Sequence, residues 1–534
     1  MAKQILFGND GRQKLTAGMQ TLAKAVSSTL GPSGKNVVID KSFSGPVSTR
    51  DGISVSKEIE LPDPFENMGA KILNEVASKT NDNVGDGTTT AIVLASKMIE
   101  EGRRYIASGV QAQALRKGMD AAAEAVEDVI LDHAKKVEGY DQIHNVAYIS
   151  SNSDTQIADL LAKAMDSVTS NGVITIEENK GTETYLEVVQ GLQFDKGFCS
   201  PYFITDPANL STEYEDVYIL FYEKKITAVH ELVPLLEKVA PTGKPLVIVA
   251  ENVEAEALAA LVINKLQGVL QTVAVKSPGF GDRRKSLMED MAILTGGEFI
   301  SDDRGLGLDQ VELEQLGQAR KVIIDKEKTV VIDGAGEEAA IEERINQINI
   351  QMEQTTSTYD KEKFTERKAK LGGGIAVLYI GGHTEVEMKD RKDRATDALH
   401  ATRAAAESGI IPGGGTVFVR ALKALKKVKA KGDAAFGVKV VGGALEAPIR
   451  TIAANAGFDP GEVFTEVSVL KGSKGFNAFT GEYSNLVKDG VIDPTDVALT
   501  ALRNAVSIAG LNLTTDALIT DVDDHDEPVV NAVV

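Results

Sequence analysis

The chain has 534 residues, 43% of them hydrophobic and 25% charged, a composition typical of a globular protein with room for about three or four domains. Its 78 acidic and 57 basic side chains give a formal net charge of −21, which excludes nucleic acid and anionic membranes as favoured partners. A single cysteine, Cys199, rules out an internal disulfide, and there is no run of the roughly 20 apolar residues that a bilayer span needs. Because the amino-terminal residues also lack a leader-like pattern, we expect a cytoplasmic protein.

The amino-terminal part of the chain has mainly helical patterns. Apolar residues at helical spacing predict a helix over 10–30, which a Gly-Pro pair ends. Short strands are expected at 36–39 and 47–49, on either side of another Gly-Pro turn. The segment from about 65 to 135 is Ala-rich and helical, with an interruption at 80–90.

The middle of the chain changes to an α/β pattern. A strand is predicted at 173–176, and from 190 to 335 strand-like runs alternate with helical ones, as in an α/β domain. A charged helical stretch follows at 336–370, and the Gly-rich segment 371–375 predicts a hinge or sharp turn. Residues 385–408 are again helical.

The carboxyl-terminal part returns to helical patterns. Three consecutive glycines open an Ala-rich block that we expect to be helical to about 515, and an acidic, disordered tail is expected from Asp521 to Val534. Helical patterns at both ends and an α/β pattern between them suggest one domain built from both termini with another inserted into it.

The run Gly85-Asp86-Gly87-Thr88-Thr89-Thr90 is the main candidate for a phosphate site. Two glycines let the backbone approach a ligand, and the apolar run that follows predicts a helix whose amino terminus would face an anion. Its carboxylate could hold Mg²⁺ against phosphate oxygens. The alternative is an ordinary Asp or Thr helix cap, although three threonines in succession are unusual for one.

Other candidates are weaker by themselves. The turn Leu30-Gly31-Pro32-Ser33-Gly34-Lys35 fails the P-loop pattern, because two residues instead of four separate its glycines and asparagine follows its lysine. Carboxylates such as Asp51 and Asp397 are most often helix caps or solvated surface groups. Together with a phosphate loop they could supply a water-positioning base and a metal or phosphate partner.

Apolar stripes in the middle segment have two interpretations. The usual one is domain core, and the alternative is an exposed groove that binds unfolded chains or an extended loop. Spacing does not decide between them. The stripes consist of Phe198, Tyr202, Phe203, Val233, Leu236, Leu258, Val262 and Ile263.

Several motifs, taken in order, resemble those of the group I chaperonins, the GroEL family. The resemblance runs from about residue 2 to 520. It rests on Thr29-Leu30-Gly31-Pro32, Asp51-Gly52, Gly85-Asp86-Gly87-Thr88-Thr89-Thr90, Ser277-Pro278-Gly279-Phe280-Gly281-Asp282-Arg283-Arg284, Asp397-Ala398-Leu399-His400-Ala401-Thr402-Arg403 and Gly413-Gly414-Gly415.

The resemblance implies a multidomain α and α/β fold. A mostly helical equatorial ATPase domain would take 1–132 and 408–534, and a small α/β intermediate hinge domain 133–189 and 375–407. An α/β apical domain would take 190–374, with glycines at its hinges. Such subunits form heptameric rings, and two rings stack into a double ring.

The resemblance also implies an ATP site with Mg²⁺, and K⁺ is plausible. Asp86 would ligate Mg²⁺, and Asp397 would position the attacking water with help from Asp51. The phosphates would be wrapped by Thr29, Leu30, Gly31, Pro32, Arg50, Gly87, Thr88, Thr89 and Thr90. The adenine and ribose would lie near Gly414, Asn477, Ala478, Phe479 and Asp493.

The eight residues of the apolar stripes match the family's binding face for non-native polypeptides and for a GroES-type co-chaperonin. The implied function is ATP-dependent encapsulation and refolding of proteins, also under stress, in the bacterial cytoplasm. A group II chaperonin is disfavoured because the apical segment lacks room for the extra lid.

Some positions depart from the family pattern. Arg50 replaces a common lysine, Phe479 replaces a usually small residue, and Cys199 lies inside the binding face. The tail has no Gly-Gly-Met repeats, which leaves open an accessory paralogue that binds clients with little ATP cycling.

Overall fold

The computed structural model describes residues 3–40, 46–137, 139–168, 173–179, 181–207, 209–301, 305, 307–355 and 357–521. Contacts divide the chain into unit 1, Met1–Ala162 with Lys389–Val534, and unit 2, Lys163–Met388. Both ends of the chain therefore belong to unit 1, and unit 2 is inserted between them. The finer division into three domains stays a prediction. The acidic tail lies outside the described residues, except for Asp521.

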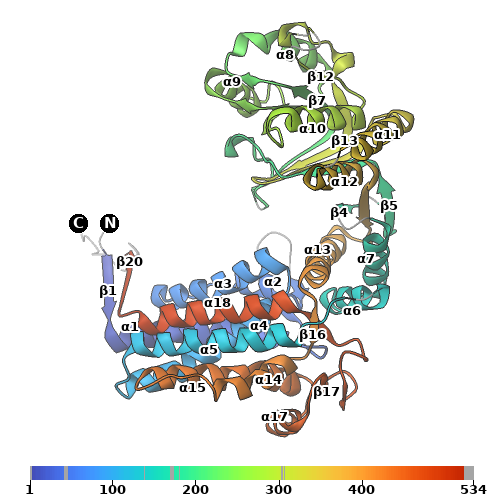
Figure 1. The fold of residues 1–534 in the computed structure, drawn as a ribbon. Helices are drawn as coiled ribbons and strands as arrows, with labels where there is room; N and C mark the ends of the chain where they lie inside the picture. The colour runs from blue at the N-terminus through green and yellow to red at the C-terminus, as the bar shows by residue number, and fades with distance from the viewer. Residues whose placement is uncertain are drawn as a thin grey trace, which may run out of the picture. The chain divides into compact units, whose positions relative to one another are not determined.

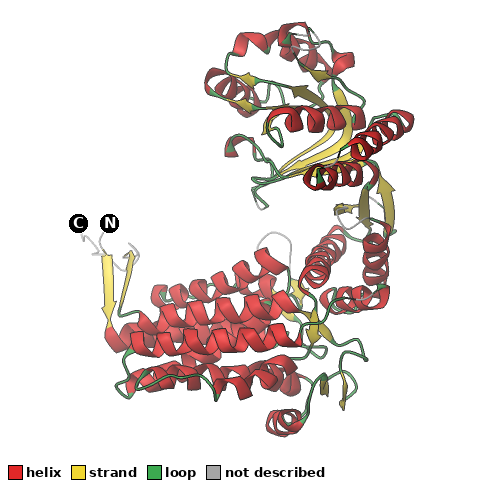
Figure 2. Ribbon diagram, viewed as in Figure 1, coloured by secondary structure: helices red, strands yellow, loops and turns green. Residues whose placement is uncertain are grey.

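Unit 1 consists mainly of long helices (Figures 1 and 2). The first group is α1 (Gly8–Ser27), α2 (Gly52–Lys57), α3 (Pro64–Val84), α4 (Thr88–Ala107), α5 (Ala112–His133), α6 (Tyr140–Ser150) and α7 (Thr155–Ser167), which continues into unit 2. The second group is α13 (Glu385–Ser408), which begins in unit 2, then α14 (Thr416–Leu425), α15 (Ala434–Leu445), α16 (Ala447–Asn455), α17 (Pro460–Val469) and α18 (Thr495–Thr514).

The core of unit 1 joins helices from both ends of the chain. Helix α1 packs on α3, α4 on α18 and α5 on α15. Apolar residues at helical spacing fill the space between them, among them Leu15, Leu22, Leu73, Leu94, Met98, Leu115 and Leu502, all fully buried. None of the helices in the described ranges combines the length and the apolar composition that crossing a membrane requires.

Short strands complete unit 1. Strands β1 (Lys3–Phe7) and β20 (Ala517–Asp521) pair antiparallel, so a segment from the start of the described chain lies beside one from its end. The other pairs are β2 (Val37–Ile39) with β3 (Val47–Thr49), β16 (Ile410–Pro412) with β19 (Ile492–Pro494), and β17 (Lys474–Asn477) with β18 (Glu482–Asn485).

The prediction of an unbroken helical block to about 515 is therefore wrong. Strands β17, β18 and β19 interrupt it, because a tight turn with Gly481 at a φ of 76° reverses the chain. Phe476 and Tyr483 then lie opposite each other across the hairpin, with ring centroids 5.4 Å apart.

Unit 2 contains a mixed sheet of seven strands and a smaller one of three. The larger has the order β11-β9-β7-β13-β14-β6, with β12 also paired to β7, and the smaller has the order β4-β15-β5. The strands are β4 (Val173–Glu178), β5 (Tyr185–Val189), β6 (Gly191–Phe194), β7 (Thr212–Tyr222), β9 (Leu246–Ala250), β11 (Thr272–Lys276), β12 (Phe299–Ile300), β13 (Gly317–Ile324), β14 (Thr329–Gly334) and β15 (Ile375–Ile380). A separate short parallel pair is β8 (Lys225–Ile226) with β10 (Asn252–Val253).

Helices cover the larger sheet of unit 2 (Figure 1). They are α8 (Val233–Val239), α9 (Ala255–Leu266), α10 (Gly281–Leu294), α11 (Glu338–Gln354) and α12 (Thr358–Gly372). The charged stretch predicted at 336–370 is thus two helices rather than one, because Ser357 begins α12 by accepting a hydrogen bond from the backbone N–H of Asp360. The turn predicted at 371–375 lies between α12 and β15.

A buried carboxylate holds three helices of unit 2 together. Asp290 of α10 accepts two hydrogen bonds from Arg367 of α12, at 2.7 and 2.9 Å, and one from Arg344 of α11 at 2.7 Å. Asp290 and Arg367 are both buried. Removal of the carboxylate would leave buried positive charge without compensation, which is far more costly than the loss of an exposed ion pair.

We therefore expect Asp290→Ala to destabilise unit 2 by about 3–5 kcal/mol. Hydrogen exchange in α10, α11 and α12 under increasing urea would measure this loss. As a control, Lys328→Ala removes a weak exposed pair with Asp325 and should cost less than about 1 kcal/mol. Equal effects of the two substitutions would contradict the expectation.

Candidate functional site

The candidate phosphate site is the turn between α3 and α4 in unit 1. Asp63 begins α3 by accepting hydrogen bonds from two backbone N–H groups, and α3 ends at Gly85 with a φ of 68°. Gly87 precedes α4 with a φ of 79°, a left-handed conformation that residues with side chains rarely adopt. The helix therefore starts at Thr88 with free N–H groups directly after the glycine turn.

Two helices from the other end of the chain pack closely on this turn. A Cβ atom at Gly85 would lie 2.3 Å from the Cβ of His400 on α13, and one at Gly87 would lie 2.6 Å from Cγ1 of Val497 on α18. Glycine at both positions therefore allows α13 and α18 to contact the turn. Neither His400 nor Val497 was among the site residues predicted from the sequence.

Asp86 lies in the middle of the turn, and both of its carboxylate oxygens accept hydrogen bonds. Oδ1 accepts from the backbone N–H of Gly87 at 2.5 Å, and Oδ2 accepts from the hydroxyl of Ser150 at 2.9 Å. Burial raises the pKa of Asp86 above its ordinary value, the hydrogen bonds oppose this, and the charge of Asp51 raises it further. Ser150 ends α6 and carries no sequence signal that would have identified it.

Asp51 lies beside the threonines of the turn. Its carboxylate caps α2 by accepting two backbone N–H groups, at 2.8 and 3.3 Å. A Cβ atom at Gly52 would lie only 2.2 Å from Oγ1 of Thr89, so the start of α2 contacts the start of α4. Thr88 and Thr89 are buried there, whereas Thr90 is partly exposed.

The turn Thr29–Pro32 is connected to the same region. Thr29 is buried, and the side-chain amide of Asn455 donates to the carbonyl of Leu30 at 2.9 Å. Arg50 donates to the carbonyl of Pro32 at 3.1 Å. The Nε–H group of Arg50 is buried and has no acceptor among the described residues, so one donor of this guanidinium is left for another ligand.

Asp397 lies on the part of α13 that packs in unit 1. Ala401 and Ala405, one and two turns further along α13, pack with Val146, Ile410 and Ile492. Burial raises the pKa of Asp397 to about 9, and the charges of Asp51, Asp86 and Asp393 contribute to this shift. The structure therefore brings these three carboxylates close enough to Asp397 for their charges to act on it, and Asp393 is one that the sequence patterns did not indicate.

The residues predicted around adenine and ribose form a second cluster in unit 1. Asp493 of β19 pairs with Ile411 of β16, directly before the three glycines. Burial raises the pKa of Asp493 to about 7, and the charge of Asp86 adds to this, which connects the cluster to the phosphate turn. Gly414 has a φ of 63°, and a Cβ there would have no atom nearer than 3.6 Å.

The hairpin after β17 supplies the remaining predicted residues of this cluster. Asn477 and Ala478 are buried, and Oδ1 of Asn477 accepts from the backbone N–H of Phe479 at 3.1 Å. The side chain of Phe479 is 83% exposed, so this departure from the family pattern adds an aromatic surface without filling the core.

A comparison with known protein families identifies the chain. The model of the TCP-1/cpn60 chaperonin family matches residues 22–523, a range that includes every site residue described above. This chain belongs to the TCP-1/cpn60 chaperonin family. The match confirms the resemblance at the level of the chaperonins and the multidomain α and α/β fold class. It indicates a chaperone role in protein folding, with nucleotide use, ring assembly and binding of unfolded polypeptides as general family properties.

The site of this chaperonin fits a nucleotide with Mg²⁺. Arg50 has a buried donor without an acceptor, and α4 presents its free N–H groups next to Asp86. Within the described ranges, no group of three or more His, Cys, Asp and Glu side chains could hold a metal ion. Mg²⁺ in nucleotide sites commonly has only one or two carboxylate ligands and takes others from phosphates, so Asp86 would suffice.

The predicted binding face of the chaperonin lies in unit 2 and is partly exposed. Tyr202, Val233 and Ile263 are exposed, at 66%, 39% and 51%. Four further predicted residues are partly buried against the core: Phe198, Leu236, Leu258 and Val262.

Phe203 was predicted on this face, and here the prediction is wrong. Its side chain is fully buried in the core of unit 2, because it follows Tyr202 in a short 3₁₀ helix, Pro201–Phe203, in which adjacent side chains point about 120° apart. The carbonyl of Phe203 also accepts the buried hydroxyl of Thr212 at 2.8 Å. Two exposed apolar residues at the end of α9 and just beyond it were not predicted: Leu266, the last residue of α9, is 63% exposed, and Val269 is 61% exposed.

We expect Asp397→Asn to stabilise the nucleotide-free protein, with a gain that increases from about pH 5 to about pH 8. Because the pKa of Asp397 is raised to about 9, its contribution to stability is fully present below the ordinary carboxyl pKa and is lost as the pH rises towards 9. The gain should increase by at most about 1.4 kcal/mol per pH unit. Thermal unfolding at several pH values would measure it.

The control for this prediction is Asp132→Asn, which changes an exposed carboxylate on α5 and should leave the pH dependence unaltered. A gain in stability from Asp397→Asn that is the same at every pH would show that burial and the neighbouring carboxylates do not raise the pKa of Asp397.

Proposed function

We propose that this chain is an ATP-driven folding chaperone of the group I, GroEL-type class. The observation that carries the proposal is the joint placement of Asp51, Asp86 and Asp397 beside the turn that starts α4. A phosphate site flanked by several carboxylates suits phosphoryl transfer, where positioning and charge compensation supply most of the catalysis. The group I assignment rests on the motif resemblance and on an apical segment too short for a built-in lid.

The proposed roles in the phosphate site follow from the contacts of each residue. Asp86, held by Ser150 and by the Gly87 N–H, would ligate Mg²⁺, which when bound offsets the negative charge of the phosphates. The N–H groups at the start of α4 and the free donor of Arg50 would bind phosphate oxygens. The turn Thr29–Pro32 would cover the phosphates from the other side.

Asp397 is the proposed general base, with Asp51 as its helper. A carboxyl group with a pKa of about 9 keeps its proton at neutral pH and cannot accept one from water. Burial is the largest cause of that raised pKa, and the charges of Asp51 and Asp86 add to it, so a cation held at Asp86 would lower it in part. Binding of Mg²⁺ with the nucleotide would therefore favour the base form of Asp397, and this condition would couple hydrolysis to occupancy.

The nucleoside would bind at the second cluster. Asp493 is the proposed partner of the ribose hydroxyls, and the open backbone at Gly414 leaves space for close approach. Asn477, Ala478 and Phe479 would surround the adenine. The exposed ring of Phe479 could then stack on the base rather than block it.

The exposed apolar residues of unit 2 are the proposed binding face for non-native polypeptides and for a GroES-type co-chaperonin. Because one surface would serve both ligands, binding of the co-chaperonin would release the polypeptide into a closed chamber. A net charge of −21 supports a hydrophilic chamber wall. Heptameric rings stacked into a double ring, with the bacterial cytoplasm as the location, complete the proposal.

We predict that Asp397→Ala slows ATP hydrolysis by about 10²–10⁴-fold and leaves ATP binding within a few-fold of the parent protein. Loss of the base removes water activation, whereas the phosphate contacts of the α4 turn are retained. Steady-state hydrolysis and equilibrium nucleotide binding would be measured together. Unchanged turnover in this variant would remove Asp397 from the proposed role.

The accessory-paralogue alternative is tested by refolding of a stringent client with and without a GroES-type co-chaperonin. A foldase should show ATP turnover and refolding that depends on the co-chaperonin. Client binding without turnover would instead establish a holding chaperone, the function that the altered tail and Arg50 leave open.

For the binding face, we predict that Ile263→Ser weakens capture of a chemically unfolded client by several-fold, about 1 kcal/mol, because it removes exposed apolar area from α9. Ile350→Ser on α11 is the matched control, since Ile350 is exposed to a similar extent, 54% against 51%, outside this face. Light-scattering assays of client aggregation would compare the two. Equal losses would show that capture is not localised to the predicted face.

A further inference from the structure

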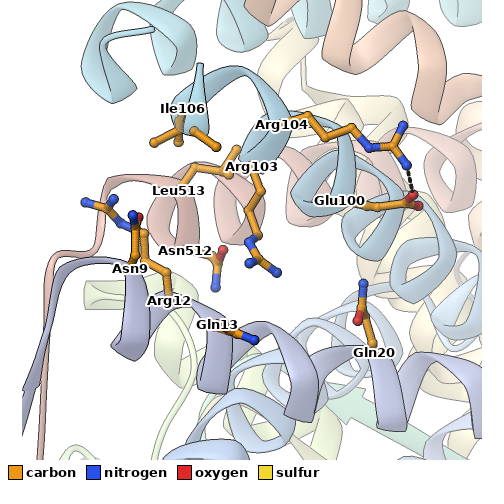
Figure 3. Close-up of a pocket in the computed structure, with 11 residues that line it drawn as sticks. Asn9, Arg12, Gln13, Gln20, Glu100, Arg103, Arg104, Ile106, Asn512 and Leu513 are labelled. Carbon is orange, nitrogen blue, oxygen red and sulfur yellow. Dashed lines mark hydrogen bonds and ion pairs between the residues drawn. The ribbon is translucent and has the colours of Figure 1, made fainter. Parts of the chain in front are cut away.

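A polar cavity in unit 1 lies apart from the proposed nucleotide site. It is formed by α1, α4 and the end of α18 and encloses about 400 Å³ (Figure 3). This volume is within the range of small-molecule sites in proteins. None of the residues assigned above to nucleotide, Mg²⁺ or catalysis lines it.

Arg103 is the unusual residue of this cavity. Its side chain extends from α4 into the space in front of α1 (Figure 3) and is only partly exposed. Within the part of the chain that the structure describes, no carboxylate or other acceptor pairs with its guanidinium group. A partly buried cation without compensation attracts an anion more strongly than a fully solvated one.

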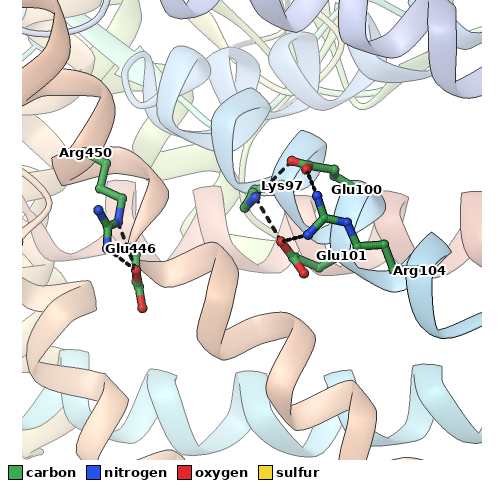
Figure 4. A network of polar contacts seen from close by, with 6 residues as sticks. All are labelled: Lys97, Glu100, Glu101, Arg104, Glu446 and Arg450. Carbon is green, nitrogen blue, oxygen red and sulfur yellow. Dashed lines mark hydrogen bonds and ion pairs between the residues drawn. The ribbon is translucent and has the colours of Figure 1, made fainter. Parts of the chain in front are cut away.

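The neighbouring cations, in contrast, are already paired. Arg104 turns away from Arg103 and contacts Glu100 at 2.6 Å and Glu101 at 3.1 Å, and Lys97 contacts the same two carboxylates at 2.9 Å (Figure 4). Lys97 and Arg104 therefore compensate Glu100 and Glu101, and neither carboxylate pairs with Arg103. Glu100 lines the cavity too, but Lys97 and Arg104 neutralise its charge.

The other walls of the cavity add hydrogen-bonding groups. Arg12 of α1 donates to the carbonyl of Thr515 at 2.9 Å and is ion-paired with Asp516 at 2.6 Å, so its charge is already compensated. Gln13 and Gln20 point into the cavity from α1 (Figure 3).

Asn512 of α18 forms the floor of the cavity. It is 3% exposed, and among the described residues its amide nitrogen donates to the sulfur of Met19 alone, at 3.4 Å. A thioether is a weak acceptor, so this buried amide is poorly satisfied. The guanidinium group of Arg103 with amides beside it is a donor set suited to phosphate or carboxylate oxygens.

We propose that this cavity binds a small oxyanion with two or more phosphate or carboxylate groups, and that Arg103 makes the principal ion pair. The proposal is independent of the ATPase function, because the two sites share no residue. The carboxylate groups that occupy the cavity could also belong to the chain itself. In the sequence, Asp523, Asp524, Asp526 and Glu527 follow soon after β20 and offer carboxylates.

Calorimetric titration of the full chain with inorganic pyrophosphate in metal-free buffer, with and without ADP, tests the proposal. We expect binding that persists when ADP is present and that Arg103→Gln weakens by about tenfold or more, the usual size of one charge-assisted contact. Lys117→Gln is the matched control. It removes one exposed positive charge on α5 outside the cavity and should leave the affinity unchanged.

A chain that ends at Asp521 distinguishes the two sources. Tighter pyrophosphate binding after truncation would assign the cavity to the chain's own carboxylates, and unchanged binding would assign it to a free anion. Equal affinity of the parent protein and Arg103→Gln would overturn the proposal, as would no binding at millimolar pyrophosphate. Because Arg103 has no partner to lose among the residues that the structure describes, Arg103→Gln should fold normally, and unchanged thermal unfolding would verify this. Loss of ADP binding alone would count against the proposed ATPase and not against this site.

Discussion

Repulsion among Asp51, Asp86 and Asp397 is the constraint on which the candidate site depends. Burial, together with the charge of Asp51, raises the pKa of both Asp86 and Asp397, so these carboxyl groups are costly to hold together, and such arrangements concentrate at functional sites. Each group is therefore fixed by a different element: Asp51 by capping α2, Asp86 by Ser150 of α6, and Asp397 by the packing of α13. The cost is tolerated because a large apolar core supports all of these elements, and positive charge brought with a ligand would relieve it.

The helical core of unit 1 explains how residues so distant in sequence reach one place. Helices α1, α3, α4, α5, α15 and α18 share one cluster of buried residues, so segments from both ends of the chain are fixed against one another. Glycines at 52, 85 and 87 then remove the side chains that would keep α2, α13 and α18 apart from the phosphate turn. The rigid core and the missing side chains together position groups that no single element could hold.

Those parts of the fold and of the candidate site that depend on local sequence patterns could be predicted from the sequence. The helix predicted at 10–30 is α1, Gly8–Ser27, and the glycine turn before α4 lies where its motif placed it. Contacts between distant segments could not be predicted. The hydrogen bond from Ser150 to Asp86, the approach of His400 and the pairing of β1 with β20 depend on tertiary packing. Phe203 shows the same limit, because a stripe of apolar residues does not indicate which of its members face inward.

The helices of unit 2 show why the remaining apolar residues are available for binding. In α9, Ala257 and Leu261 are buried and already fill the side that faces the sheet, whereas Ile263 and Leu266 are exposed. In α8, Leu235 and Val239 are buried and Val233 is exposed. Because the residues that face inward complete the core, the apolar residues that face outward contribute little to folding. Their side chains remain exposed to water. When exposed apolar side chains of this kind contact apolar side chains of another chain, both are removed from water and the free energy falls. Capture of an unfolded polypeptide requires this interaction.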